Sequence, residues 1–198
     1  MNSLVLASSS PRRIDLLRQA GYEFVVANPS RPEIPTGFLT ANELTLWNAH
    51  RKASEIAQQH ADQVVLSADT VVALGAVLFG KPTDENHAEA MLAELAGRTH
   101  RVVTSIVVSS LQAQRRKSGT IITEVTFKPL SRGQIAEYVH RVSPLDKAGA
   151  YSAQEDAGNI IEQVRGSFTN VVGLPMEVVP ELLAQFGVFP KTGARSEE

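Results

Sequence analysis

Apolar and polar positions alternate along this chain in blocks that favour strands and helices in turn. Runs rich in valine, leucine and other strand-forming residues predict strands at 3–7, 22–28 and 64–74, the last as one strand or as two with a bend. Between them, the spacing of apolar residues predicts helices at 11–20 and 41–60. Strands and helices that alternate in this way are typical of an α/β domain.

Residues that stabilise helix ends mark where the helices begin. A serine or threonine side chain can accept a hydrogen bond from a free backbone N–H, and proline suits the first helical turn. Such residues predict five helix starts: Ser10 with Pro11, Thr40 with Glu43, Thr83, Ser131 with Gln134, and Pro175. The helix after Thr83 is expected at 84–96, and the helix after Ser131 is expected to end at Arg141.

The middle of the chain predicts a hairpin, which changes the expected sheet. Two β-rich segments, 100–111 and 119–130, flank a polar turn, and we expect its Arg115-Arg116-Lys117 run at the solvated tip. Because hairpin strands are antiparallel, the expected fold class is α/β with a mixed β-sheet flanked by helices. No linker divides the chain, so we expect a single domain at 1–189 with two lobes, followed by a disordered tail at 190–198.

The composition excludes several classes of protein. The 198 residues are 43% hydrophobic and 20% charged, which is enough apolar material for a core. The net charge of −2 gives no overall basic field for DNA or RNA, and no apolar run approaches the ~20 residues of a membrane span. Cysteine is absent, which fits a reducing compartment. We therefore expect a cytoplasmic protein that binds neither nucleic acid nor membrane.

The segment SSSPRR at 8–13 is the first candidate for chemistry. A helix start offers unpaired backbone N–H groups and a partial positive charge. Hydroxyl and guanidinium groups at the same place make a cradle for phosphate. The alternative is a helix cap beside two solvated arginines. The glycine-rich loop GxxxxGK[ST] is absent from the sequence, so a P-loop is excluded.

Asp69 is the second candidate, because it interrupts a strongly apolar strand. A buried carboxylate without a partner would cost several kcal/mol, so we expect a metal, a cation or a reacting water beside it. The alternative is a structural aspartate that bonds to the backbone at a bend. The five histidines show no metal-ligand spacing.

Other polar residues are weaker candidates. Lys81 follows a short apolar strand, and could reach a phosphate or be an ordinary surface lysine. Small residues at 146–151 would let the backbone approach a ligand, and Gln154 could pair with the polar edge of a base. Glu33 and Lys52 would each be a solvated charge if taken alone.

Five short motifs in this order resemble the Maf family. They are LASSSPRR, SADTVV, GKP, LDKAGAY and NVVGLP, and the likeness spans about 3–187. The chain is most similar to the subgroup that hydrolyses dTTP and UTP to the monophosphate and pyrophosphate. The resemblance implies a two-lobed fold around a nucleotide-binding cleft and a divalent metal, Mg or Mn. The chain departs from the pattern of this subgroup at Glu155, where glycine is usual.

The resemblance also implies roles for individual residues. Asp69 would be the catalytic base and, with Glu33, a metal ligand. Base specificity would rest on Arg12, Thr70 and Gln154. The phosphate-binding residues would be Ser8, Ser9, Ser10, Arg13, Lys52 and Lys81.

Other functions stay open at this point. The chain could be a nucleotide-responsive interaction protein in cell division or septum formation, or a Maf-type enzyme that prefers 7-methyl-GTP or CTP. An RNA-binding module is disfavoured, because neither an RNP-type aromatic pair nor a GXXG loop occurs. The expected partner is a small nucleotide, and a homodimer is left open.

Overall fold

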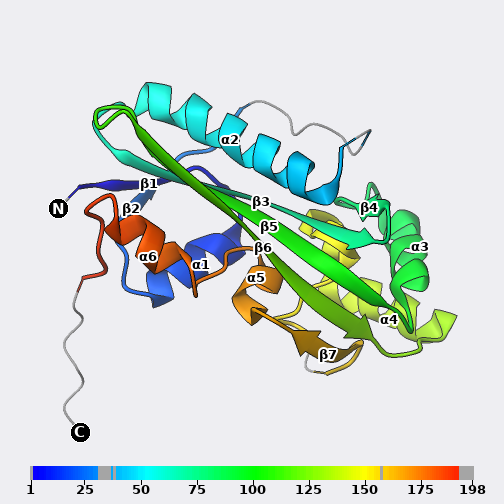
Figure 1. Cartoon of the computed structure of the whole chain (residues 1–198). Helices are drawn as coiled ribbons and strands as arrows, with labels where there is room; N and C mark the ends of the chain where they lie inside the picture. The colour runs from blue at the N-terminus through cyan, green and yellow to red at the C-terminus, as the bar shows by residue number, and fades with distance from the viewer. Residues whose placement is uncertain (1, 31–36, 38, 157, 192–198) are drawn as a thin grey trace, which may run out of the picture.

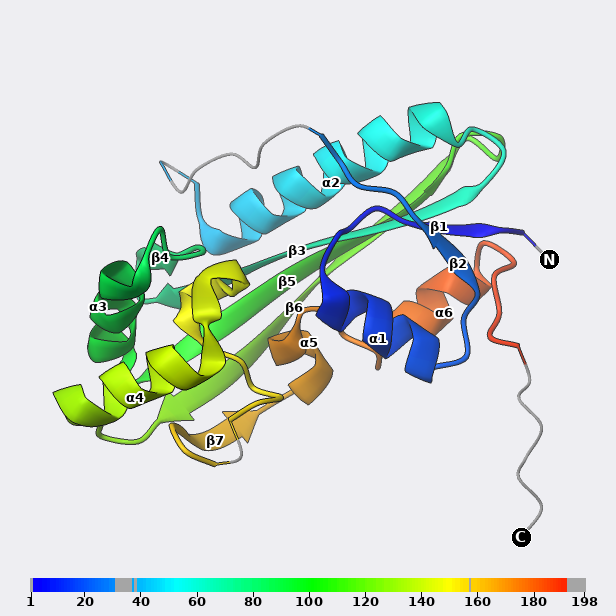
Figure 2. The ribbon, with the colours of Figure 1, turned by 180° about the vertical axis from the view of Figure 1, so that it is seen from behind.

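The computed structural model describes residues 2–30, 37, 39–156 and 158–191, which contain one seven-stranded sheet with helices on both faces (Figures 1 and 2). The strands are β1 (Leu4–Leu6), β2 (Phe24–Val26), β3 (Val64–Leu74), β4 (Val77–Phe79), β5 (Thr99–Ser110), β6 (Arg115–Phe127) and β7 (Ile161–Arg165). The helices are α1 (Pro11–Gln19), α2 (Ala41–Gln59), α3 (Glu85–Leu95), α4 (Arg132–Val142), α5 (Phe168–Val172) and α6 (Val179–Ala184), with 3₁₀ turns η1 (Pro144–Asp146) and η2 (Ala148–Ala150).

The sheet changes direction at β3. On one side β3 pairs in parallel with β1, and β1 pairs in parallel with β2. On the other side, β3, β5, β6 and β7 pair antiparallel in that order. The order β2-β1-β3-β5-β6-β7, with β4 paired to β3, confirms the mixed sheet predicted from the sequence. Residues 64–74 form one continuous strand rather than two.

Two apolar cores lie toward opposite ends of the long central strands and define two lobes. One core joins Leu66 and Ala68 of β3 to α1 and α6. The other joins Val72 of β3 to α3 and α4. Asp69 and Thr70 occupy β3 between these cores. The strand therefore carries its polar residues at the boundary of the lobes.

Helix α2 runs along one face of the sheet and packs on β3 and β5 (Figure 2). The predicted capping box is confirmed, with Thr40 and Glu43 bonding reciprocally at the helix start. Small residues let the helix approach the sheet closely, since Ala49 and Ala53 pack against Val107. This close packing brings polar side chains of α2 within reach of β3.

Two expected helix starts are wrong. Asp84, and not Thr83, is the N-cap of α3, because its side chain accepts a hydrogen bond from the His87 backbone N–H. The last helix begins at Val179 with Pro180 in its first turn. Pro175 instead begins a turn, in which its carbonyl accepts from the backbone N–H of Val178 at 3.1 Å.

The expected hairpin tip is also wrong, because residues 115–117 belong to β6. The chain reverses just before them, where Gln114 has a φ of 47°. Charged residues are tolerated at this end of β6, because β7 pairs only with 124–127 and leaves 115–117 exposed. Two of them are anchored there, since Arg115 donates to the Gln185 carbonyl at 2.8 Å and Arg116 to Ser54 Oγ at 3.1 Å.

The start of the expected tail is attached to the first lobe. The backbone N–H of Lys191 donates to the Gly21 carbonyl at 2.8 Å, and the Lys191 side chain pairs with Glu23. The disordered tail expected from residue 190 is therefore wrong for this part. Residues 192–198 lie outside the described residues.

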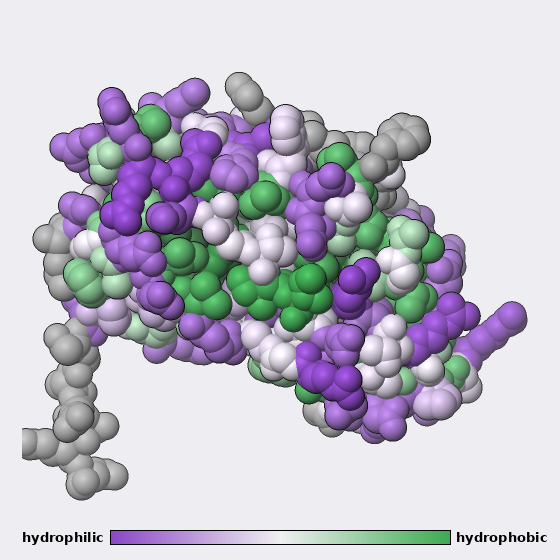
Figure 3. All heavy atoms as spheres, viewed as in Figure 1, coloured by the Kyte–Doolittle hydropathy of each residue, from purple (hydrophilic) through white to green (hydrophobic). Residues whose placement is uncertain are grey.

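The surface is mixed in polarity. Figure 3 shows an apolar area in the middle of one face, between polar margins. Exposed apolar side chains include Ile122 of β6 and Phe168 of α5.

Among the helices described, none has the length and apolar character needed to cross a bilayer. The homodimer stays a prediction.

Candidate functional site

A cavity of about 270 Å³ lies where the two lobes meet. Its lining comes from segments that are far apart in the sequence: 7–13, 69–72, 80–81, 146–151 and 171–173. Most of the residues singled out from the sequence thus reach one place. The size is near the lower end of the roughly 300–1,000 Å³ that is usual for small-molecule sites.

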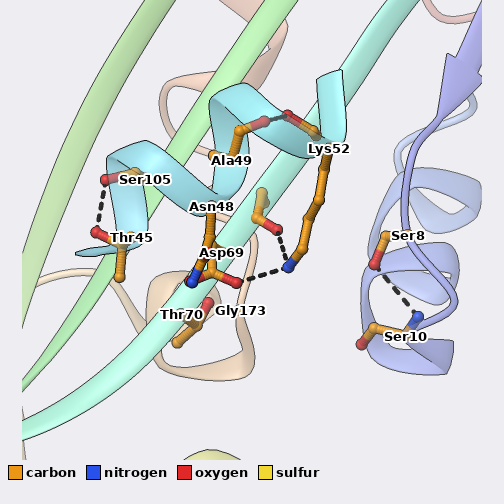
Figure 4. A network of polar contacts seen from close by, with 12 residues as sticks. Ser8, Ser10, Thr45, Asn48, Ala49, Lys52, Asp69, Thr70, Ser105 and Gly173 are labelled. Carbon is orange, nitrogen blue, oxygen red and sulfur yellow. Dashed lines mark hydrogen bonds and ion pairs between the residues drawn. The ribbon is translucent and has the colours of Figure 1, made fainter. Parts of the chain in front are cut away.

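Asp69 is held in this cavity by two side chains from α2. Its side chain is buried, at 8% exposure, and its Oδ1 lies 2.6 Å from Lys52 Nζ. Its Oδ2 accepts a hydrogen bond from Asn48 Nδ2 at 3.2 Å. Figure 4 shows Asn48 and Lys52 reaching from α2 toward Asp69. The partner expected for a buried acid is therefore a cation, Lys52. Sequence reasoning missed Asn48, although its i, i+4 spacing from Lys52 puts both on one helix face.

Arg13 is buried at the boundary of the lobes and joins four parts of the chain. Its Nε donates to the Gly173 carbonyl at 2.7 Å. Its Nη1 donates to Ser8 Oγ at 3.2 Å and to the Ala68 carbonyl at 2.9 Å. Its Nη2 donates to Thr70 Oγ1 at 3.0 Å. The guanidinium expected to bind phosphate thus also holds α1, β3 and the 173 loop in register.

Arg12 lies across the mouth of the cavity from its ion-pair partner, Asp146. Arg12 Nη1 is 2.7 Å from Asp146 Oδ2, and Arg12 Nη2 donates to the Asp146 carbonyl at 3.3 Å. Lys147 Nζ is 2.9 Å from Asp146 Oδ1, so two cations share one carboxylate. Partial burial would raise the pKa of Asp146, but hydrogen bonds from Lys147 and Arg12 outweigh it and lower that pKa below its ordinary value.

Lys147 is a site residue that the sequence interpretation did not assign. Its side chain is only 9% exposed. A lysine this buried needs a partner, which Asp146 supplies. It lies in the LDKAGAY motif, beside a glycine with a φ of 70°. A Cβ on Gly149 would lie 2.8 Å from Val72 Cγ2, so glycine is needed to bring η2 against β3. The signal in the sequence was therefore the small residues after the lysine.

The predicted phosphate cradle also lines the cavity. Ser8, Ser9 and Ser10 precede α1, and Ser10 occupies its N-cap position without a side-chain cap bond. Lys81 is exposed at the other side of the cavity. The backbone N–H of Gly149 donates to the Gly80 carbonyl at 2.9 Å, which fixes the segment that carries Lys81.

Tyr151 forms an aromatic part of the cavity wall and is fixed from behind. Its hydroxyl is 3.0 Å from His100 Nε2, and its ring meets Phe127 edge to face at 4.9 Å. Burial lowers the pKa of His100 to about 4, so the imidazole is neutral at pH 7. Burial also raises the pKa of the Tyr151 hydroxyl well above its ordinary value. The pair is therefore a rigid, uncharged support for the cavity wall. Nothing in the sequence indicated this role for His100.

One of the expected site residues that the structure describes, Gln154, is not brought into the cavity. Gln154 is exposed and is absent from the described residues that line the cavity. The backbone of Ser152 is held by the Tyr138 hydroxyl, at 3.1 Å from its N–H, and the chain then turns outward. Glu33 lies outside the described residues. Within the described ranges, no three His, Cys, Asp or Glu side chains gather as a metal cluster.

The cavity combines one deep acid with several cations. Arg12, Lys52, Lys81 and Lys147 line it, together with the buried Asp69 of β3. Such a site can hold a highly charged anion and can place a carboxylate beside it. It can therefore bind phosphate esters or anhydrides.

Comparison with known proteins agrees with this geometry. A family model described as Maf-like protein matches residues 3–186. A protein named dTTP/UTP pyrophosphatase from Symbiobacterium thermophilum is 42% identical over 187 residues, covering 94% of this chain and 95% of that protein. One of the same name from Myxococcus xanthus is 43% identical over 185 residues, 93% of each. The structure of the Staphylococcus aureus Ham1 protein shares the fold, with a TM-score of 0.51 at 19% identity over 93% of this chain and 99% of that chain.

Proposed function

This chain belongs to the Maf-like protein family, and on that premise we propose that it hydrolyses dTTP and UTP to the monophosphate and pyrophosphate. The observation that carries the proposal is the position of Asp69. It is a buried carboxylate, paired with Lys52, in a cavity whose lining also includes Arg12, Arg13, Lys81 and Lys147. This is the arrangement that a reaction of water with a phosphoanhydride needs.

Charge neutralisation explains substrate binding. A nucleoside triphosphate carries roughly four negative charges, which Lys52, Lys81 and Arg12 offset together with the α1 N-terminus. The hydroxyl groups at 8–10 donate to phosphate oxygens beside that helix start. The net charge of −2 does not oppose binding, because the local field governs the approach of the substrate.

Asp69 acts on the attacking water. Its carboxylate accepts a proton while the water oxygen bonds to the α-phosphorus. The bond between the α-phosphorus and the bridging oxygen breaks, and pyrophosphate leaves with the electron pair. Asn48 and Lys52 hold the two carboxylate oxygens in place, so the base is already oriented before substrate binds.

The proposal includes a divalent metal, Mg²⁺ or Mn²⁺, because the charge of a triphosphate calls for more neutralisation than side chains alone supply. Mg²⁺ commonly takes one or two carboxylates and completes its shell with phosphate oxygens and water, so a dedicated cluster is not required. Asp69 would hold it, together with Glu33. When bound, the metal would offset charge on the phosphates.

Pyrophosphate release by the purified protein tests the proposal. UTP and dTTP are expected to be hydrolysed with a higher kcat/KM than ATP, GTP or 7-methyl-GTP, to equal amounts of monophosphate and pyrophosphate. Excess EDTA is expected to stop the reaction, and added Mg²⁺ to restore it. Stepwise release of single phosphates, or a ranking led by a purine, would contradict the proposal. Nucleotide binding without turnover would instead favour a nucleotide-responsive interaction protein.

The absence of cysteine fits a reducing compartment. We therefore place the enzyme in the cytosol, where nucleoside triphosphates are made and used. Fractionation of cells with an antibody to the chain would test this location.

A further inference from the structure

Arg13 belongs to a closed ring of hydrogen bonds at the boundary of the two lobes. Its Nε donates to the Gly173 carbonyl at 2.7 Å, and its Nη2 donates to Thr70 Oγ1 at 3.0 Å. Thr70 Oγ1 lies 2.9 Å from Thr104 Oγ1, which donates to the backbone carbonyl of Asn170 at 3.3 Å. The backbone N–H of Gly173 donates to the same carbonyl at 3.0 Å and closes the ring.

Thr104 places a hydroxyl group in the buried part of β5. Its exposure is 0%, and the residues two positions away on the same face of the strand, Val102 and Ile106, are buried and apolar. Thr104 lies directly opposite Thr70 in the sheet, so the two side chains project from the same face. Because a buried hydroxyl without a partner is costly, Thr104 depends on its bonds to Thr70 and Asn170.

The ring fixes the direction of each hydroxyl proton. Arginine N–H groups can only donate, so Thr70 Oγ1 accepts from Arg13. A backbone carbonyl can only accept, so the single proton of Thr104 points to Asn170. The bond between the two threonines therefore uses the proton of Thr70. In the opposite arrangement, lone pairs of Thr104 and the Asn170 carbonyl would face each other at 3.3 Å, which is repulsive.

We propose that Thr104 is a positioning residue for Arg13. By accepting the Thr70 proton, it keeps a lone pair of Thr70 turned toward the guanidinium, which holds Arg13 in the orientation that binds the triphosphate. Arg13 lines the cavity, whereas Thr104 is not among the lining residues that the structure describes. The inference rests on the proposed function, and it adds a residue that acts through Arg13 rather than by contact with the substrate.

The loss of the Thr104 hydroxyl would act on both arms of the ring. The Thr70 proton would lose its acceptor and could turn toward Arg13 Nη2, where two hydrogens would face each other. The Asn170 carbonyl would keep only the Gly173 N–H within the ring, so the turn that offers its own carbonyl to Arg13 Nε would be held less firmly. Both changes would loosen the guanidinium without removing its charge.

The first test measures the binding of a non-hydrolysable UTP analogue by calorimetry. Thr104→Val keeps the branched shape and removes the hydroxyl, and it is expected to weaken binding by about fivefold, as for one lost hydrogen bond. Thr104→Ser restores the hydroxyl and is expected to stay within about twofold of the wild type. The matched control is Thr99→Val, which removes an exposed hydroxyl 2.9 Å from Thr126 Oγ1 on the same strand and is expected to bind normally.

Thermal unfolding shows whether each variant is folded. Unchanged affinity in a folded Thr104→Val protein would overturn the inference, and so would failure of Thr104→Ser to restore binding. If Thr104→Val did not fold, Thr104→Cys would replace it, because a thiol is only a weak donor and a weak acceptor. Weaker binding is expected for that variant as well, and normal binding would again overturn the inference.

The second test is a double-mutant cycle with Arg13→Lys. Lysine lacks the second branch of the guanidinium, so Thr104→Val is expected to cost less than about twofold in affinity in the Arg13→Lys background. An equal cost in both backgrounds would show that Thr104 does not act through Arg13 and would overturn the inference. Lack of UTP hydrolysis by the wild type would refute the proposed function, whereas this binding cycle would still decide the role of Thr104.

Discussion

Lys52 Nζ lies 2.6 Å from Asp69 Oδ1, and the pair joins α2 to the strand at the boundary of the two lobes. Both side chains are mostly buried, with exposures of 13% and 8%. Removing one partner from a buried pair is costly, because the other charge is left in a poor solvent. The pair therefore fixes the position of the acid between the two lobes.

Asp69→Asn is expected to remove hydrolysis in a protein that still folds, with some loss of stability because Lys52 loses its charged partner. Asparagine keeps the size of the side chain and its contact with Asn48, but it cannot take a proton from water. The loss of a general base typically costs about 100- to 10,000-fold in rate. Pyrophosphate release measures the activity, and thermal unfolding serves as the control. Near-normal turnover in a folded Asp69→Asn protein would refute the assignment of Asp69 as the general base.

Arg13→Ala is expected to lower both stability and triphosphate affinity. The substitution leaves four acceptors without their donor, on Ser8, Ala68, Thr70 and Gly173. We expect a loss of roughly 2–4 kcal/mol in the free energy of unfolding. Arg13→Lys should recover only part of it, because an ammonium group cannot copy the planar fork.

Two measurements separate the roles of Arg13. Chemical denaturation gives the stability, and calorimetry with a non-hydrolysable triphosphate gives the affinity. Unchanged affinity in a destabilised Arg13→Ala protein would limit Arg13 to holding the lobes together and would refute phosphate binding by this residue.

His100 is expected to make the fold sensitive to acid. Its pKa is about 4 in the folded protein, lowered by burial from an ordinary value of 6.5. As the pH falls below about 6.5, His100 binds a proton in the unfolded chain but stays neutral in the folded chain. Stability is therefore lost between about pH 6.5 and pH 4. The loss from this group approaches about 3 kcal/mol at the lower limit.

The check on this pH dependence is a difference between two proteins. Urea unfolding at pH 7, 6 and 5 is compared for the wild type and His100→Gln, in which a glutamine amide can still donate to the Tyr151 hydroxyl. Carboxylates that titrate in both proteins cancel in the difference. A parallel decline of the two stabilities would show that His100 is not the sensor.

Gly149→Ala is expected to destabilise the second lobe and to slow hydrolysis. A Cβ at this position would lie 2.8 Å from Val72 Cγ2, and the φ of 70° is strained for alanine. The cost should be about 1–3 kcal/mol. Because the Gly149 N–H holds the Gly80 carbonyl, activity should fall as Lys81 moves. Val72→Ala should relieve part of the loss in the double variant, and no relief would mean that backbone strain alone is responsible.

The sequence predicted the elements of this fold better than their ends. The β-branched runs and the capping pair Thr40–Glu43 were sufficient for the sheet and for α2. The hairpin tip was misplaced because a run of charges resembles a turn, whereas the end of a strand that has no partner on one side tolerates the same charges. Local composition could not distinguish these two cases.

The site was predicted less completely, because its partners depend on tertiary packing. An acid in an apolar strand marked Asp69 as a residue in need of a partner, but nothing local showed that α2 would place Asn48 beside it. Lys147 was overlooked because its burial follows from the approach of η2 to β3. In the opposite direction, Gln154 had suitable chemistry, but the turn after Tyr151 directs it to the surface.

The Arg13–Gly173 bond has a consequence for synthesis of the protein. It joins residues 160 positions apart, and the other partners of Arg13 come from two further segments, Ser8 before α1 and Ala68 and Thr70 of β3. Contacts of such long sequence separation form late, after the loops between them have closed. A growing chain on the ribosome thus cannot complete the cavity until the segment around residue 173 has emerged. Chains that end before this segment would lack a complete cavity and could not hydrolyse nucleotides.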